Sequence, residues 1–103
     1  MTHRAFIGVG SNLGIPAENC KKAITLINNH HSIKEMACSS LYHTEPIGKT
    51  NQPWFVNLAL EVQTSLTAQE LLQQLLRIEQ QFGRVRKVKW EARVIDLDIL
   101  DYD

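Results

Sequence analysis

The sequence predicts an α+β protein in which one antiparallel sheet carries two helices on one face. Three observations predict it. Stretches with the two-residue apolar period of a strand alternate with two stretches that have the helical period. Their order is strand, helix, strand, strand, helix, strand (βαββαβ), with turn-forming residues between them. The 103 residues are also enough to bury one modest core, so we expect a single domain over residues 1–103.

The first half of the chain predicts a strand, a helix and a second strand. The run RAFIGVG at residues 4–10 is short, apolar and ends in glycine, as expected for a buried strand. The turn sequence SNLGIP follows, and its Pro16 suits the first position of a helix. The second strand is expected within residues 33–44, where the alternation is weaker. Apolar residues recur at helical spacing between these strands, at Cys20, Ala23, Ile24 and Ile27.

The clearest strand is predicted at residues 54–63, where alternate residues share one side. One side carries Val56, Leu58, Leu60 and Val62, and the other carries Phe55, Asn57, Ala59 and Glu61. A second helix should follow, because Thr67 and Glu70 have the spacing of a capping box. Its buried face is expected at Leu71, Leu75, Ile78 and Phe82, and Gly83 predicts its end.

A last strand is predicted from about Val94 to Leu100. Ile95, Leu97 and Ile99 should face one side, and Val94, Asp96, Asp98 and Leu100 the other. Two helices of this size can cover one face of four strands and leave the other face open. The sequence therefore predicts a ferredoxin-like sandwich, with a four-stranded antiparallel sheet and two helices on one face.

Composition and charge exclude several classes of protein. The hydrophobic fraction of 44%, the charged fraction of 21% and a formal net charge of zero are those of a soluble globular protein, so no overall field points to nucleic acid or membrane partners. The chain has no apolar run of 18 residues and no signal sequence, which predicts a cytoplasmic protein. Cys20 and Cys38 lie outside any metal-binding motif.

Two acidic residues on the last strand are the first candidate site. Asp96 and Asp98 share a face, with Cα atoms roughly 6 to 7 Å apart. Adjacent carboxylates repel unless a cation or proton lies between them, and Mg²⁺ takes one or two protein carboxylates together with phosphate and water oxygens. A basic stretch from Arg77 to Arg93 precedes them and would share the charge of a phosphate ligand. The alternative is an ordinary solvated face of an amphipathic strand.

Aromatic and amide side chains on the same open face suggest a second ligand. Phe55 and Asn57 would suit a planar heteroaromatic ring with an amide-like edge, because an amide donates and accepts at once. A surface aromatic with a polar neighbour is the plain alternative. Trp90 lies within the basic stretch and is expected either to pack back on the core or to close over a ligand.

Five segments of the chain resemble the 6-hydroxymethyl-7,8-dihydropterin pyrophosphokinase family, whose members transfer a pyrophosphoryl group from ATP to a pterin in folate biosynthesis. These segments are GVGSNLG, SSLYHTEPIG, QPWFVNLALEV, IEQQFGRVR and ARVIDLDIL. They follow one another in the family's order and span nearly the whole chain. The resemblance implies a cytoplasmic transferase with ATP as co-substrate, two Mg²⁺ ions and small-molecule substrates, without nucleic acid or membrane partners. It leaves open whether the chain forms a homo-oligomer.

The resemblance also implies roles for individual residues. Asp96 and Asp98 would bind the metal ions. The pterin would be bound by Thr44, Glu45, Ile47, Phe55, Asn57 and Trp90. ATP would be bound by Glu79, Arg86, Lys87, Arg93 and Ile99. The catalytic cations would be Arg84, Arg86 and Arg93, with Arg86 the strongest catalytic candidate.

The chain differs from the family pattern in three respects. Glu45 stands where the family often has proline, and WEAR at residues 90–93 replaces a Trp-Gly-Pro-Arg run. Family members also continue for about half this length again, so we expect a short form that lacks the usual C-terminal part of the ATP site. Two hypotheses follow: a working Mg²⁺-dependent pyrophosphokinase, or a catalytically weak or inactive pterin- or nucleotide-binding relative. A third hypothesis, single-stranded RNA binding on the open sheet face, is opposed by Asp96 and Asp98, which would repel the RNA backbone.

Overall fold

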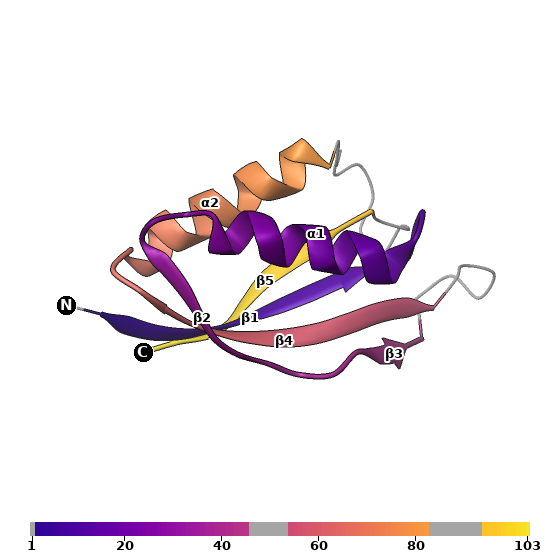
Figure 1. Cartoon of the computed structure of the whole chain (residues 1–103), viewed down its shortest axis with the longest axis horizontal. Coiled ribbons are helices and arrows are strands. Elements are labelled where there is room, and N and C mark those ends of the chain that lie inside the picture. The colour runs from indigo at the N-terminus through magenta and orange to yellow at the C-terminus, as the bar shows by residue number, and fades with distance from the viewer. Residues whose placement is uncertain (1, 46–53, 83–93) are drawn as a thin grey trace.

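The computed structural model describes residues 2–45, 54–82 and 94–103. The described strands form one antiparallel sheet in the order β2-β4-β1-β5, with β3 pairing beside β2 along β4. Both helices cover the same face of this sheet, and both termini lie at the end opposite to β3 (Figure 1). The elements are β1 (His3–Ser11), α1 (Pro16–Asn28), β2 (Ile33–Cys38), β3 (Tyr42–Thr44), β4 (Phe55–Thr64), α2 (Ala68–Gln81) and β5 (Asp96–Tyr102).

The predicted α+β, ferredoxin-like arrangement is confirmed, but the predicted number of strands is wrong. In the described part of the chain the sheet has five strands, because the segment expected as one strand forms both β2 and β3, which pair with the two ends of β4. Ser39 lies between them and bonds both backbone groups of Ala59: its N–H donates to the Ala59 carbonyl (2.9 Å), and its hydroxyl accepts from the Ala59 N–H (2.8 Å). The Ser39 hydroxyl thus takes the place of a backbone carbonyl in the hydrogen bonding to β4, at the point where β2 ends and before β3 begins.

The core lies between the sheet and the two helices, as the apolar periods predicted. Alternate residues of the two central strands point into it, and both helices contribute a stripe of apolar side chains. Its fully or nearly fully buried members include Ala5, Ile7, Val9, Leu58, Leu60, Val62, Cys20, Ala23, Ile27, Leu71, Leu75 and Ile78. Burial raises the pKa of the Cys20 thiol, which is consistent with its predicted place in the core.

The helix starts also follow the predictions. Pro16 is the first residue of α1. The capping box of α2 is present: the Glu70 N–H donates to the Thr67 hydroxyl (3.1 Å), and the Thr67 N–H donates to the Glu70 carboxylate (2.9 Å). The predicted helix end at Gly83 lies outside the described residues.

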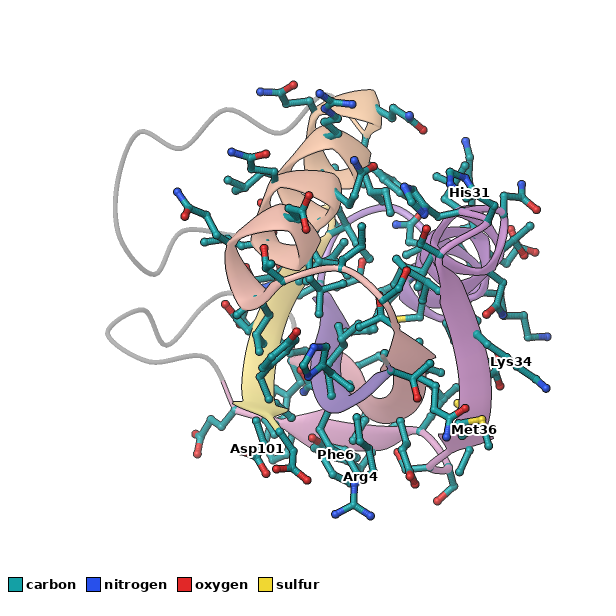
Figure 2. The ribbon with its side chains drawn as sticks, turned by 90° about the vertical axis from the view of Figure 1, so that its left-hand side faces the viewer. Arg4, Phe6, His31, Lys34, Met36 and Asp101 are labelled. Carbon is teal, nitrogen blue, oxygen red and sulfur yellow. The ribbon has the colours of Figure 1, made fainter. Side chains whose placement is uncertain are left out.

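The last strand lies two residues further along the chain than predicted, at Asp96–Tyr102. Leu97 is buried and Asp98 exposed, as the alternation requires. A bulge at Leu100, between the pairs Ile7–Ile99 and Phe6–Asp101, places Leu100 and Asp101 in succession on the open face. Figure 2 shows Asp101, Phe6 and Arg4 on the side of the sheet away from the helices. Neither of the two described helices is long and apolar enough to cross a membrane.

Candidate functional site

Two glycines of β1 lie between the predicted substrate and metal residues. Gly10 pairs with Asn57 of β4 on one side and with Asp96 of β5 on the other. Two residues earlier on the same strand, Gly8 pairs with Ala59 of β4 and with Asp98 of β5. Ile7 and Val9 point into the core, so the open face of β1 carries only backbone here. We call Gly8 and Gly10 the glycine strip.

The glycine strip has no room for a side chain at Gly10. A Cβ atom there would lie 2.6 Å from the Asn57 Oδ1 atom and 3.9 Å from Cδ1 of Phe55. Phe55 and Asn57 therefore both border Gly10, and Asp96 borders it from the other side. The structure thus brings two of the predicted ring-binding residues, Phe55 and Asn57, and a predicted metal ligand to the same three-strand section of the open face.

The Asn57 side chain has a fixed orientation. Its Nδ2 donates a hydrogen bond to Thr44 Oγ1 on β3 (2.7 Å), which directs Oδ1 towards the glycine strip. Thr44 in turn pairs with Phe55 in the β3–β4 ladder. The short strand β3 therefore holds the amide so that an acceptor oxygen faces the position where a ligand would lie over Gly10.

The aspartates provide a donor set that fits a hard divalent cation. Asp96 is half-buried, Asp98 is exposed, and their pairing with Gly10 and Gly8 places both carboxylates along the same side of the glycine strip. Within the described ranges, no group of three or more His, Cys, Asp or Glu side chains gathers in one place. Two carboxylates suit Mg²⁺, which completes its octahedron with water and phosphate oxygens, whereas a structural zinc site would require four ligands.

Glu79 lies on the other side of the sheet. It is 4% exposed, projects from α2, and accepts a hydrogen bond from the Leu97 N–H at its Oε2 atom (2.8 Å). Leu97 is the residue between Asp96 and Asp98, so this contact is made directly to the acidic segment of β5. The predicted contact of Glu79 with ATP stays a prediction.

Of the remaining predicted site residues, the structure describes two, Ile99 and Glu45. Ile99 packs against the core opposite Ile7, and Glu45 is exposed just after β3. Their predicted contacts with ATP and with the pterin stay predictions. The other predicted residues lie outside the described part of the chain: Ile47, Arg84, Arg86, Lys87, Trp90 and Arg93.

Tyr42 and the glycine strip lie beside the predicted site residues but were not themselves predicted as part of the site. Tyr42 is 47% exposed and pairs with Asn57, so it extends the row Asn57–Gly10–Asp96 by one strand. The alternation of Tyr42 with Thr44 was a usable signal. The role of Gly8 and Gly10 required the register of three strands, which the spacing of residues along the chain does not contain.

A family model and several curated proteins that resemble this chain all point to the same enzyme family. Residues 6–103 match the family model described as 7,8-dihydro-6-hydroxymethylpterin-pyrophosphokinase. The chain is 40% identical over 100 residues to the 2-amino-4-hydroxy-6-hydroxymethyldihydropteridine pyrophosphokinase of Bacillus subtilis, covering 97% of this chain and 60% of that protein. The proteins of the same name from Methylorubrum extorquens and Haemophilus influenzae are 42% and 40% identical, with 97% and 95% of this chain and 63% and 61% of those proteins covered.

These curated relatives are longer than the chain, which spans about three fifths of their length. The match nevertheless includes β1 from Phe6 onward, all the other described strands and helices, and all of the predicted site residues. On this match, the chain belongs to the 7,8-dihydro-6-hydroxymethylpterin-pyrophosphokinase family.

Proposed function

We propose that this chain carries the substrate- and metal-binding face of a pyrophosphokinase that transfers the pyrophosphoryl group of ATP to the hydroxymethyl group of 6-hydroxymethyl-7,8-dihydropterin, in folate biosynthesis. One observation supports this most directly: Asn57 and Asp96 flank Gly10 in a single cross-strand row. Their strands are two strand spacings apart, or about 9.6 Å. A pterin held at Asn57 and a phosphate chain held at Asp96 would therefore meet over the glycine strip.

The pterin side would act by orientation. The Asn57 Oδ1 would accept from the amide-like edge of the ring, while its Nδ2 is held by Thr44. The half-buried ring of Phe55 borders the same position and offers a surface for stacking. Holding the acceptor in one geometry keeps the hydroxymethyl oxygen near the transferred group, and such positioning is a large part of catalysis in phosphoryl transfer.

The metal side would be built on Asp96 and Asp98. Bound Mg²⁺, expected as two ions, would neutralise charge on the ATP phosphates. The aspartates would hold the cations on the face that also carries the pterin residues. Arg84, Arg86, Lys87 and Arg93 are proposed to share the phosphate charge, with Arg86 foremost, and Trp90 to cover the pterin. Small soluble substrates are consistent with the proposed cytoplasmic location.

The decisive test is AMP release from ATP and Mg²⁺, with and without 6-hydroxymethyl-7,8-dihydropterin. AMP should form only when the pterin is present, and Asp98→Ala should abolish it. Asp101→Ala is the matched control, because Asp101 is an exposed aspartate on the same strand and face but lies opposite Phe6 rather than the glycine strip. Its AMP release should equal that of the wild type.

Three outcomes separate the hypotheses. Pterin-independent AMP release, or release unchanged in Asp98→Ala, would contradict the proposal. No AMP, but saturable pterin or nucleotide binding by calorimetry, would support the binding relative without turnover. Both substitutions should leave the unfolding free energy within about 0.5 kcal/mol of the wild type, because they change exposed side chains away from the core. Sedimentation of the same samples would give the oligomeric state.

A further inference from the structure

Glu79 is the one charged side chain in the described part of the chain that is buried. A carboxylate buried without hydrogen bonds is costly, so a glutamate in such a place requires a compensating contact. Glu79 also occupies a position, four residues after Leu75, that a leucine could fill on the apolar stripe of α2. The packing of the helix therefore does not explain why the residue is acidic.

The contact of Glu79 is made to the backbone of an edge strand. Among the strands that the structure describes, β5 pairs with β1 alone, at the end of the sheet order β2-β4-β1-β5. Backbone groups on the free side of an edge strand have no strand partner. The Leu97 N–H instead donates to Glu79 Oε2 at 2.8 Å, within the buried layer under α2. The Glu79 side chain of α2 thus supplies the hydrogen-bond acceptor that a neighbouring strand would otherwise supply to β5.

The place of this hydrogen bond along β5 gives it a consequence for the site. Leu97 lies between Asp96 and Asp98, and its own side chain is buried. A shift or twist of the backbone at Leu97 would move both carboxylates at once, because the two aspartates project from its two neighbouring residues. Metal binding tolerates only a few tenths of an ångström in the positions of its oxygen ligands.

We propose that Glu79 is a positioning residue: through the Leu97 N–H it holds the backbone of β5 so that Asp96 and Asp98 present their carboxylates together to a divalent cation. This inference rests on the proposed function, since it takes these aspartates as metal ligands. Glu79 acts from the helix side of the sheet and through its hydrogen bond to Leu97, and its predicted contact with ATP stays a separate prediction.

The test compares Glu79→Ala with Glu79→Gln. Glutamine keeps an oxygen that can accept from the Leu97 N–H, whereas alanine removes the acceptor. Affinity for Mg²⁺ in the presence of a non-hydrolysable ATP analogue, measured by calorimetry, should fall about 10- to 100-fold in Glu79→Ala, as is usual when a residue that orients a metal ligand is lost. It should stay within about threefold of wild type in Glu79→Gln.

A second readout does not depend on the metal. Amide hydrogen exchange should show Leu97 losing protection relative to Leu60 in Glu79→Ala, and keeping it in Glu79→Gln. Thr64→Val is the matched control, because it removes the hydrogen bonds of another buried side chain, remote from the aspartates. Thr64 Oγ1 donates to the Ser32 carbonyl (2.7 Å) and accepts from the Leu66 N–H (3.1 Å). It should lower stability and leave both the Leu97-to-Leu60 ratio and the Mg²⁺ affinity unchanged.

Each contrary result has its own meaning. Normal Mg²⁺ affinity or normal Leu97 protection in Glu79→Ala would overturn the positioning role. An equal loss of affinity in Glu79→Gln and Glu79→Ala would overturn it in favour of action through the charge of Glu79. If the wild-type protein bound neither Mg²⁺ nor the ATP analogue, the proposed metal site would fail, and the role of Glu79 towards it would fail with it. Leu97 protection would then show only whether the hydrogen bond forms.

Discussion

The two faces of the sheet have opposite character, although the same strands make both. Towards the helices, β1 and β4 present aliphatic side chains that are fully or almost fully buried, such as Ile7 and Leu60. On the open face the residues paired next to them are Gly8 and Ala59, followed by Gly10 and Asn57. The period of two along a strand allows one face to supply the stability and the other to supply the candidate site.

This separation has a practical consequence. Substitutions of the aliphatic side chains that β1 and β4 present to the helices should change the free energy of unfolding and leave the chemistry of the open face largely intact. Truncation of exposed side chains on the open face should change ligand binding and leave the free energy of unfolding largely intact. The predictions below test this contrast from the largest expected effect to the smallest.

The largest effect is expected in the core. Leu60→Ala removes a fully buried side chain from the central strand β4 and should lower the free energy of unfolding by about 3 kcal/mol. Leu100→Ala is the matched control, because that leucine is 58% exposed on the open face and its loss should cost no more than about 0.5 kcal/mol. Urea denaturation measures both. Equal losses in the two variants would contradict the separation of the faces.

The glycine strip should tolerate a methyl group at one position only. In Gly10→Ala the new Cβ would lie 2.6 Å from Asn57 Oδ1, which is tied to Thr44, so we expect about 1–2 kcal/mol of destabilisation and weaker pterin binding. In Gly8→Ala the nearest atom is Leu100 Cδ2 at 3.2 Å, the end of an exposed side chain that can move. That variant should stay within about 0.5 kcal/mol of the wild type, because its unfolded chain also loses entropy.

Denaturation and pterin calorimetry on the two glycine variants give the answer together. If Gly8→Ala weakened pterin binding as much as Gly10→Ala, the contact between Gly10 and Asn57 would not account for the loss of pterin affinity.

A smaller effect is expected at the start of α2, far from the site. Thr67→Ala removes the hydroxyl that accepts from the N–H of residue 70 and should lower the unfolding free energy by about 1 kcal/mol. Thr67→Asp should recover most of it, because aspartate is also a good N-cap. The ligand affinity of the open face should not change in either variant. A change there would mean that the start of this helix is coupled to the site.

The smallest effect is a pH dependence. Hydrogen bonds from Thr67 hold the pKa of the Glu70 carboxyl below its ordinary value of 4.5. A group with a lowered folded-state pKa contributes stability above its unfolded pKa and loses it as the pH falls through the folded value. The Glu70 contribution should therefore be complete above about pH 4.5 and decline below it. Glu70→Gln should flatten that part of an acid denaturation curve, and an unchanged slope would contradict this role.

Much of the fold could be predicted from the sequence because local signals specify it. The capping box at Thr67 and the alternation in β4 are both read within a few residues, and both are confirmed. The division of residues 33–44 into β2 and β3 could not be predicted, because it depends on Ser39 bonding to Ala59, twenty residues away. The extension of β5 to Tyr102 likewise passes through a bulge opposite Phe6 and Ile7, which the sequence pattern does not reveal.

For the candidate site, the sequence alone indicated the type of chemistry. Two aspartates with an intervening apolar residue, and an aromatic two residues before an amide, predict a cation and a planar ligand because the period of a strand puts each pair on one face. The tertiary structure decided that both pairs meet across Gly10, and that Glu79 contacts the backbone between the aspartates from the helix side of the sheet. The physical reason is that period is a property of one strand, whereas register and burial arise only when separate segments pack.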